Sequence, residues 1–569
     1  MSIANMQKNI DHVVHIMLEN RSFDNILGYL TWGSSNNVPP HNNPPLRQNE
    51  KKFYGLHDED FWQPSNLSYF LPYGPFQYKR LPVIKVEPGG DWDYCEMPHA
   101  DPGEPFQDVW QQIYGWSYPK KCQKDRRMKG FYLNYLVARN PDEFSNQDIL
   151  ACFTPGTLPV LNGLASNYAV SDMWFSSIPT QTNPNRAFSI CGTSLGRINN
   201  NEDPDTYKTC GEPYATDPLT AKPVNTIFSV FNAFSDANPG RPVTWKIFSE
   251  YDWYNIGGGG WSNWIKDGDA GKCCTQVKPG QKFTQYMFPN GTDNTMWGGT
   301  GSIGDFVDAV NNDTLPSFSY IEPVFYPEVY YEAYNLNSYH PPESVYRGEV
   351  FIKSVYDALT ANPKVWDRTL LIITFDEHGG TLDHVLLPEN AIAPDGNVHQ
   401  NPDFDFTRYG VRVPTIMVSP WVTPGTVFRG DYWPETTNEQ ALPFDHTTIL
   451  ATLCRWKGIE CADQQRYPQY YLGARTAKAP LFADVITNTA TSQPVDLTVH
   501  KNCSVTEKGL HRRSEAVANL SRKVQAITGA NPEDTDHLDS VNEILSQSRT
   551  REDVEAALDA LRKKLLNRG

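Results

Sequence analysis

The sequence predicts an α/β protein with a doubly wound, parallel sheet, and three observations support this prediction. Four short apolar runs have the length and composition of strands that are buried on both faces: 13–18, 317–321, 370–375 and 411–418. Apolar residues recur with helical spacing over 350–359, shortly before the third run. Three of the runs end in polar residues, and open α/β sheets bind ligands at the carboxyl ends of their strands.

Length, composition and charge limit the possible functions. The chain has 569 residues, more than one compact domain usually contains, so we expect a large body with an appendage. Aromatic residues make up 12% of the chain and charged residues only 20%, which favours a folded protein. The 66 acidic and 49 basic residues give a net charge of -17. This charge repels nucleic acid and anionic membranes, so we expect no nucleic-acid partner, while a zwitterionic lipid or a small phosphate ester stays open.

The location of the protein is only weakly indicated. No run approaches the roughly 20 apolar residues that span a bilayer, and the mean hydropathy is -0.53. Residues 1–11 lack the basic and apolar regions of a secretory signal, so we expect export by another route or a mature form, with a cytoplasmic location not excluded. The 10 cysteines show no zinc-binding spacing, which leaves both disulfides and buried thiols open.

Composition divides the chain into parts. Residues 31–125 and 200–300 are rich in Pro, Gly, Asn and Trp without clear periodicity, so we expect long loop insertions over the catalytic face. After Ser504 aromatic residues and cysteines no longer occur, and apolar residues take up helical spacing in three stretches. We therefore expect a catalytic domain over 1–503 and a helical extension over 504–569 that packs on the core, self-associates or docks a partner.

The first chemical signal follows the first apolar run. Glu19 and Asn20 come directly after the run and offer hard oxygen atoms, which suit a divalent cation. Arg21 and Asp24 follow and could orient those ligands. Taken alone, the segment is equally compatible with an ordinary capped turn.

The second signal follows the third apolar run. Asp376 and Glu377 are adjacent carboxylates, which stay ionised together only if a cation or several hydrogen-bond donors compensate them. Gly379 and Gly380 would let the backbone turn sharply beneath a bound ligand. A solvated acidic turn is the alternative, but the preceding run is too apolar for a surface edge.

The third signal is the segment TNPNR at residues 182–186. Pro184 suits the first turn of a helix with Asn183 as its cap, which would place Thr182 just before a helix N-terminus. Such a terminus stabilises anions, and a threonine hydroxyl held there beside a cation could attack phosphorus. A capped turn without chemistry is the alternative.

These segments resemble the ordered motifs of the bacterial phosphatidylcholine-specific phospholipases C and the related acid phosphatases. The matching segments are LENRSFD at 18–24, TNPNR at 182–186, HP at 340–341, DEHGG at 376–380 and FDHT at 444–447. They span most of the chain in the family's order. The resemblance implies an α/β core like that of the alkaline phosphatase superfamily and a metal-dependent phosphoric ester hydrolase.

The resemblance also implies roles for individual residues. It assigns one divalent metal ion, zinc by preference, to five ligands: Glu19, Asn20, Thr182, Asp376 and Glu377. An all-oxygen set is also compatible with calcium, magnesium or manganese. Thr182 would be the nucleophile, and His340 would contact the phosphate. His99 matches a second phosphate contact less well, because DPGE at 101–104 departs from a pattern that contains histidine.

Other residues have weaker signals. We expect His99 or His378 to protonate the leaving group, and Arg186 or His384 to contact the substrate. Structural roles are the alternative for His378, His384 and His446, and we expect them for His12 and His15. The aromatic segments 251–264 and 325–339 could form a lipid or choline wall, or simply pack.

The sequence thus predicts a phospholipase C that hydrolyses phosphatidylcholine-like lipids to diacylglycerol and a phosphorylated headgroup. Its partners would be a phospholipid and, transiently, a membrane surface. Two alternatives stay open. One is an acid phosphatase that uses the same residues on phosphomonoesters, and the other is a non-catalytic binding or delivery protein.

Overall fold

The structure is a computed structural model, and the described residues form one compact unit within 1–325 and 336–499. The described residues are 2–30, 53–56, 61–65, 69, 78–88, 97–115, 127–139, 147–200, 224–249, 284, 288, 292, 294–324, 337–394, 401, 403–434 and 436–499. The predicted extension 504–569, the aromatic segment 251–264 and most of 325–339 lie outside these residues, so the statements on them stay predictions.

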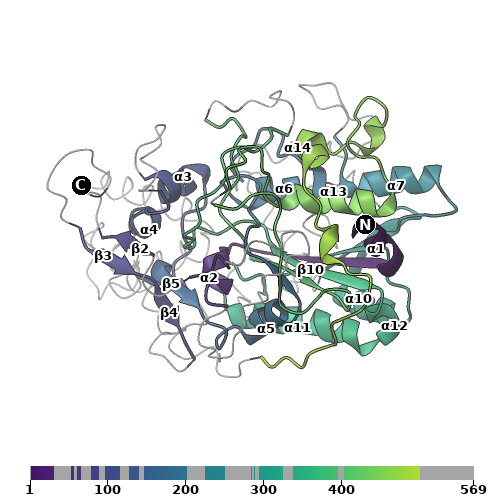
Figure 1. Ribbon diagram of the computed structural model, residues 1–569, viewed down its shortest axis with the longest axis horizontal. Helices are drawn as coiled ribbons and strands as arrows, with labels where there is room; N and C mark the ends of the chain where they lie inside the picture. Colours follow the sequence, from purple (N-terminus) through teal and green to yellow (C-terminus); the bar gives the residue numbers. More distant parts are fainter. Residues whose placement is uncertain are drawn as a thin grey trace, which may run out of the picture. The chain divides into compact units, whose positions relative to one another are not determined.

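A mixed sheet forms the centre of the described unit (Figure 1). Its strands, in spatial order, are β12 (Thr426–Val427), β6 (Ala169–Ser171), β11 (Thr415–Val418), β10 (Thr369–Phe375), β1 (His12–Leu18), β9 (Phe318–Glu322), β7 (Trp245–Ser249) and β8 (Gly298–Ser302). All neighbours from β10 to β8 pair in parallel. Two small sheets join β2 (Trp62–Pro64) to β3 (Arg80–Pro82) and β4 (Ile84–Val86) to β5 (Ala151–Phe153).

The two central strands are buried along their whole length, as their apolar sequences predict. Every residue of β1 and of β10 is buried. His15 is a polar exception in β1, and its Nε2 lies 2.7 Å from Thr374 Oγ1 on β10. Burial lowers the pKa of His15 to about 3, which keeps the imidazole neutral, as a structural role requires.

The fourth predicted strand differs from the prediction in direction and length. We expected a parallel strand over 411–418, whereas β11 begins at Thr415 and runs antiparallel to β10. Pro414 has no N–H to donate to a ladder, which delays the strand. The described parts of 376–414 contain no helix of the kind that usually forms a crossover to a parallel strand.

Helices cover both faces of the sheet, which confirms the predicted α/β class (Figure 1). One group contains α6 (Thr182–Cys191), α7 (Ile227–Ala237), α13 (His446–Lys457) and α14 (Gly473–Lys478). The other contains α5 (Pro159–Asn167), α10 (Ile303–Asn311), α11 (Val345–Ala361) and α12 (Pro363–Trp366). The remaining helices are α1 (Ser2–Asn9), α2 (Phe23–Leu27), α3 (Phe106–Tyr114) and α4 (Phe131–Arg139). The helix predicted over 350–359 is part of α11.

The prediction of loop insertions was wrong for parts of both regions. Residues 31–125 contain α3 and the short strands β2, β3 and β4. Residues 200–300 contain β7, an inner strand of the main sheet, and helix α7. The helix carries apolar residues at Ile227, Val230, Phe231 and Phe234, a helical spacing that the abundant turn residues around it obscured.

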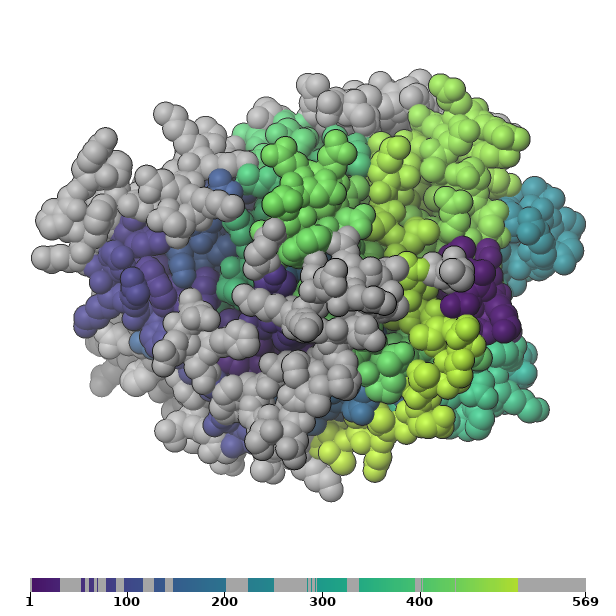
Figure 2. Space-filling model, viewed as in Figure 1, coloured from purple at the N-terminus to yellow at the C-terminus, as the bar shows by residue number. Residues whose placement is uncertain are grey.

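The two ends of the described chain are joined at the surface. Asn5 and Asn9 of α1 donate hydrogen bonds of 3.1 Å to the carbonyls of Ile486 and Thr487. Figures 1 and 2 show the purple N-terminal helix beside the yellow-green segment that contains these carbonyls. Among the described residues, no helix is both long and apolar enough to cross a membrane.

Candidate active site

The register of the two central strands brings the first two signals together. Leu18 of β1 lies opposite Phe375 of β10 in a parallel pair, so the next residues, Glu19 and Asp376, leave the sheet side by side. The guanidinium of Arg186, on α6, joins them. Its Nε lies 3.0 Å from Asp376 Oδ2 and its Nη2 lies 3.5 Å from Glu19 Oε1.

A tight turn completes this carboxylate pair. Asn20 has a positive φ of 60°, and its N–H donates to Asp376 Oδ1 at 3.2 Å. The N–H of Glu377 donates to the same oxygen at 2.7 Å. Gly379 has a φ of 58°, and a Cβ there would lie 2.1 Å from the carbonyl oxygen of Asn20. The sharp turn expected at this glycine is therefore confirmed, and no larger residue fits.

Two oxygens in this turn lack a hydrogen bond. Asn20 Oδ1 and Glu377 Oε1 have no partner within the described part of the chain, and both residues are fully buried. A buried polar atom without a partner costs about 1–3 kcal/mol, and a charged one costs more. Because both atoms are hard oxygen acceptors, a divalent cation would satisfy them.

The electrostatics of the carboxylates point the same way. Burial raises the pKa of Glu19 to about 8; Arg186 lowers it and Asp376 raises it. The pKa of Glu377 lies well above its ordinary value, because the carboxyl is buried and faces Glu104 and Asp376. A divalent cation beside these groups would favour the ionised forms of Glu19 and Glu377. The donor set therefore fits a divalent metal.

Helix α6, whose Arg186 contacts the carboxylates, carries the third signal. It begins at Thr182 with Gln181 as its N-cap, so the predicted start, with Asn183 as the cap, was wrong by two residues. Pro184 is tolerated there because the first N–H groups of a helix have no partner within it. Thr182 and Arg186 are four residues apart and share one face of α6, the face whose guanidinium contacts Asp376.

Arg186, which we expected to contact the substrate, is fully buried between α6 and the two central strands. Besides the two carboxylates, it donates to the carbonyls of Met17 and Leu18, both at 3.3 Å. This geometry suits a residue that holds Glu19 and Asp376 in position, and a contact with substrate stays a prediction.

His340 lies beside the carboxylates and contacts two acids that the motif comparison did not assign. Its Nε2 lies 3.3 Å from Glu104 Oε1 and its Nδ1 lies 4.0 Å from Asp101 Oδ1. Glu104 Oε1 also accepts a short hydrogen bond from Asn20 Nδ2. Burial alone would lower the pKa of His340, but Glu104 and Asp101 outweigh it and raise the pKa to about 10. From the sequence we assigned these acids no role, and the departure from the histidine-containing pattern at 101–104 is the signal that could have found them.

The other predicted histidines lie around this centre in different settings. His378 Nε2 is 2.8 Å from Gln112 Oε1, and burial lowers its pKa to about 3, so it is a poor proton donor near neutral pH. His446 Nε2 lies 2.6 Å from the carbonyl oxygen of Asp376, which steadies the turn. His99 Nδ1 lies 2.5 Å from Asp148 Oδ2.

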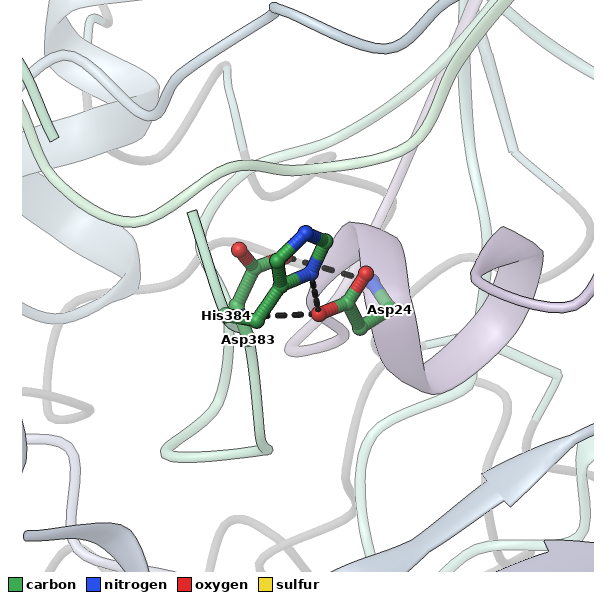
Figure 3. A group of neighbouring side chains, drawn as sticks. All are labelled: Asp24, Asp383 and His384. Atoms are coloured by element: carbon green, nitrogen blue, oxygen red, sulfur yellow. Dashed lines mark hydrogen bonds and ion pairs between the residues drawn. The ribbon is translucent and has the colours of Figure 1, made fainter. Parts of the chain in front are cut away.

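His384 belongs to a separate acidic group, shown in Figure 3 with Asp24 and Asp383. Its Nδ1 lies 2.6 Å from Asp24 Oδ2. The guanidinium of Arg412 contacts both acids, with Nη2 2.8 Å from Asp24 Oδ1 and Nε 3.0 Å from Asp383 Oδ1. A buried cationic side chain thus already balances this group, and the expected substrate contact of His384 stays a prediction.

Fold and site together define a class of protein. An α/β sheet that brings buried carboxylates together at its carboxyl edge has its usual ligand site there. The comparison with family models agrees: residues 10–459 match the phosphoesterase family, and the chain belongs to that family. The predicted class, a phosphoric ester hydrolase, is thereby confirmed.

The curated relatives carry phospholipase names. The chain is 30% identical over 356 residues to non-specific phospholipase C3 of Arabidopsis thaliana, covering 62% of this chain and 57% of that protein. Non-specific phospholipase C6 of the same plant is 29% identical, covering 85% and 74%. A non-hemolytic phospholipase C of Burkholderia pseudomallei is 25% identical, covering 78% and 54%. The match therefore spans little more than half the length of phospholipase C3 and of the Burkholderia protein.

Among solved structures, the chain is similar to a protein in the alkaline phosphatase superfamily from Vibrio parahaemolyticus. The TM-score is 0.29 and the identity is 12%, with 58% of this chain and 65% of that chain covered. No functional argument rests on a likeness at this level. The predicted fold class stands on the strand order and the helices on both faces of the sheet.

Proposed function

We propose that this protein is a metal-dependent phospholipase C that cleaves phosphatidylcholine-like lipids to diacylglycerol and a phosphorylated headgroup. One observation carries the proposal: two buried oxygens, Asn20 Oδ1 and Glu377 Oε1, have no hydrogen-bond partner among the described residues and lie in the turn beside Glu19 and Asp376. The names of the relatives in Arabidopsis thaliana and Burkholderia pseudomallei support phospholipids as the substrate class.

The proposed metal site uses Glu19, Asn20, Thr182, Asp376 and Glu377 as ligands, with zinc preferred and calcium, magnesium or manganese compatible with the oxygen donors. When bound, such a cation lowers the pKa of a hydroxyl and stabilises negative charge on phosphoryl oxygens. Arg186 would hold Glu19 and Asp376 in their places, because its guanidinium contacts both carboxylates.

The proposed nucleophile is Thr182. Its Oγ1 would attack phosphorus, forming a phosphothreonine ester of the headgroup while the bond from phosphorus to the glycerol oxygen breaks. The diacylglycerol alkoxide would take a proton as it leaves, and water would then cleave the phosphothreonine to release the phosphorylated headgroup. The first residue of α6 is favourable for this role, since helix N-termini stabilise negative charge.

His340 is the best placed cationic group for the phosphoryl oxygens. Its pKa of about 10 keeps it protonated near neutral pH when Glu104 and Asp101 are ionised. Among the expected proton donors, His378 is disfavoured by its low pKa, whereas His99 is partly exposed and keeps the role as a prediction.

The acid phosphatase is the second candidate, and the charge of the site favours the phospholipase over it. A phosphomonoester carries two negative charges near neutral pH, and a site that contains Glu19, Glu104 and Glu377 would repel it more than a singly charged diester. The threonine at position 182 also favours the phospholipases, which resemble this chain there, whereas the acid phosphatases carry serine. Transient contact with a membrane surface follows from a lipid substrate.

A comparison of two substrates tests the proposal. We expect a higher kcat/KM for phosphatidylcholine in mixed micelles than for an aryl phosphate monoester. A tenfold preference for the monoester, about 1.4 kcal/mol in transition-state stabilisation, would favour the acid phosphatase instead. Turnover of neither substrate by folded, cation-loaded protein would favour the binding protein.

A further inference from the structure

The loop that carries His340 is tied directly to the turn that follows β1. The N–H of Glu19 donates to the carbonyl of Ser338 at 2.9 Å, and Arg21 Nε donates to the carbonyl of Tyr339 at 2.7 Å. The N–H of His340 in turn donates to Ser338 Oγ at 3.3 Å. This part of the loop is therefore held against the segment that supplies the first two ligands of the proposed metal site.

Arg21 also reaches a second loop of the site. Its Nη1 donates to the carbonyl of Met97, two residues before His99, and to Asn25 Oδ1 at 3.3 Å. The side chain is fully buried, so water does not compete for these hydrogen bonds. One planar guanidinium thus joins the loop of His340, the loop of His99 and helix α2.

Tyr339 has an uncommon backbone conformation. Its φ of 77° lies in the left-handed region, which a bulky residue adopts only where its surroundings enforce it. The ring is fully buried and packs edge-on against Phe375, with the ring centres 5.4 Å apart. It also lies against Gly348, where a Cβ would be 2.0 Å from the ring. The hydroxyl donates to Glu349 Oε1 at 3.0 Å. These contacts fix the ring of Tyr339 beside the last residue of β10.

Glu349 is itself anchored, so the hydroxyl of Tyr339 has a fixed partner. The carboxyl group accepts hydrogen bonds from the N–H of Val160 at 2.6 Å and from the N–H of Leu161 at 2.9 Å, at the start of α5. These N–H groups have no partner within the helix, and a helix N-terminus favours a carboxylate. Tyr339 is thus held at its ring by residues of α5 and α11, and at its carbonyl by Arg21.

These contacts act on the imidazole of His340, because its backbone continues directly from Tyr339. The Nε2 of His340 lies 3.3 Å from Glu104 Oε1, and its Nδ1 lies 2.6 Å from the carbonyl oxygen of Pro341. A change in the backbone of Tyr339 would move the ring away from these partners. A displacement of about 1 Å in a group that acts on the reacting atoms can cost about a hundredfold in rate.

We propose that Arg21 and Tyr339 are positioning residues, which hold the imidazole of His340 where it stabilises negative charge on the phosphoryl oxygens. This inference rests on the proposed function, because both residues act through His340. The alternative is that the same contacts only stabilise the fold. A positioning residue affects the rate through one other side chain, whereas a residue that only stabilises the fold does not, so the two roles are distinguishable.

A double-mutant cycle tests the proposal, with cation-loaded protein and phosphatidylcholine in mixed micelles. Tyr339→Phe removes the hydroxyl that binds Glu349, and Arg21→Met removes the donor to the carbonyl of Tyr339. Each should lower kcat about tenfold to a hundredfold with little change in KM. When His340 is already replaced by Gln, the same substitutions should lower kcat by less than about twofold. Arg21→Lys retains a cationic donor and should recover part of the lost kcat.

Two buried side chains of the same kinds serve as matched controls. Tyr168→Phe removes a hydroxyl that donates to a backbone carbonyl at 3.0 Å. Arg475→Met removes a guanidinium that, like that of Arg21, donates to the backbone carbonyls of loop residues, here Ser177, Ile392 and Phe406. Both controls lose buried hydrogen bonds and should lower the Tm, yet kcat should stay close to that of the wild type.

Crystal structures of Tyr339→Phe and Arg21→Met give a readout that does not depend on turnover. We expect the imidazole of His340 to be displaced from Glu104 or spread over several positions. An imidazole that keeps its place in both variants, an unchanged kcat, or a loss of kcat that is equally large in the His340→Gln background would overturn the proposal. If Arg21→Met does not fold, Tyr339→Phe decides the same question.

The proposed function fails separately from this inference. A folded, cation-loaded wild type that does not cleave phosphatidylcholine contradicts the proposed function. The crystal structures of the two variants would still show whether Arg21 and Tyr339 hold the imidazole in place.

Discussion

Two groups of buried polar residues come from the same two segments, which follow β1 and β10. The two groups differ in whether hydrogen-bond donors of the protein satisfy their oxygen atoms. In the first group, Asp24 and Asp383 surround Arg412, and all four carboxylate oxygens accept hydrogen bonds from Arg412, His384 or backbone N–H groups. In the second group, Glu377 Oε1 and Asn20 Oδ1 accept none from the described residues.

The difference distinguishes acids whose charge the fold already balances from acids beside an open acceptor. A buried acid that is fully hydrogen-bonded and paired with arginine has no unsatisfied oxygen, and removal of its partner is strongly destabilising. A buried acid with an oxygen that accepts no hydrogen bond lowers the free energy of unfolding, unless a ligand supplies the missing positive charge. Both groups combine aspartate, glutamate or histidine in similar motifs, so hydrogen-bond satisfaction distinguishes them better than residue type does.

The largest effect is expected from the nucleophile. Thr182→Ala should lower kcat by at least about a thousandfold without changing the fold, because the attacking oxygen is lost. Thr180→Ala is the matched control. The hydroxyl of Thr180 is committed to the carbonyl of Ile198, so its loss should affect stability more than rate. Near wild-type turnover of phosphatidylcholine in Thr182→Ala would show that another residue attacks phosphorus.

The two acid groups should respond oppositely to the loss of a charge. Arg412→Met should lower the free energy of unfolding by about 3–5 kcal/mol, because it leaves Asp24 and Asp383 buried without a cation. Glu377→Gln should leave the stability of chelated protein unchanged or raised, but should abolish cation binding. Denaturant unfolding and metal analysis of both variants test this contrast. Equal destabilisation by the two substitutions would remove the distinction.

The pH dependence of stability should also differ in sign. The pKa of Glu19 is raised to about 8 in the folded protein, so its contribution is present below about pH 4.5 and is lost as the pH rises through 8. The pKa of Asp24 is lowered: burial would raise it, but His384 and Arg412 outweigh burial. Its contribution is therefore present above its ordinary pKa and lost on acidification.

In chelated protein, we expect the Tm to fall as the pH rises from 5 to 9. The free energy of unfolding should decrease by an amount on the order of a few kcal/mol over the same range. Added cation should reduce this fall, since it favours the ionised carboxylates. Glu377→Gln should flatten the profile as well, because the remaining acids then repel each other less. A Tm that rises steadily from pH 5 to pH 9 without cation would contradict the raised pKa values.

The sequence predicted the centre of the fold because its strands are nearly uniform in composition. Strands β1 and β10 are apolar runs that end in chemically distinctive residues, and their register then places Glu19 beside Asp376. The direction of β11 could not be read from its own residues, because direction depends on the connection that precedes the strand.

The edge of the site was harder to predict. Glu104 lies outside regular periodic segments, where neither apolar spacing nor strand ends indicate which way a side chain points. Its contact with His340 joins residues far apart in the sequence, and only the fold reveals it.

The most direct test of the central claim measures metal content and turnover on the same samples. Protein is stripped with a chelator, and aliquots are reloaded with increasing zinc or manganese before phosphatidylcholine hydrolysis is assayed. We predict no turnover in metal-free protein and a return of activity as cation binds. Full turnover in protein shown by elemental analysis to contain no metal would contradict a metal-dependent site at Glu19, Asn20, Asp376 and Glu377.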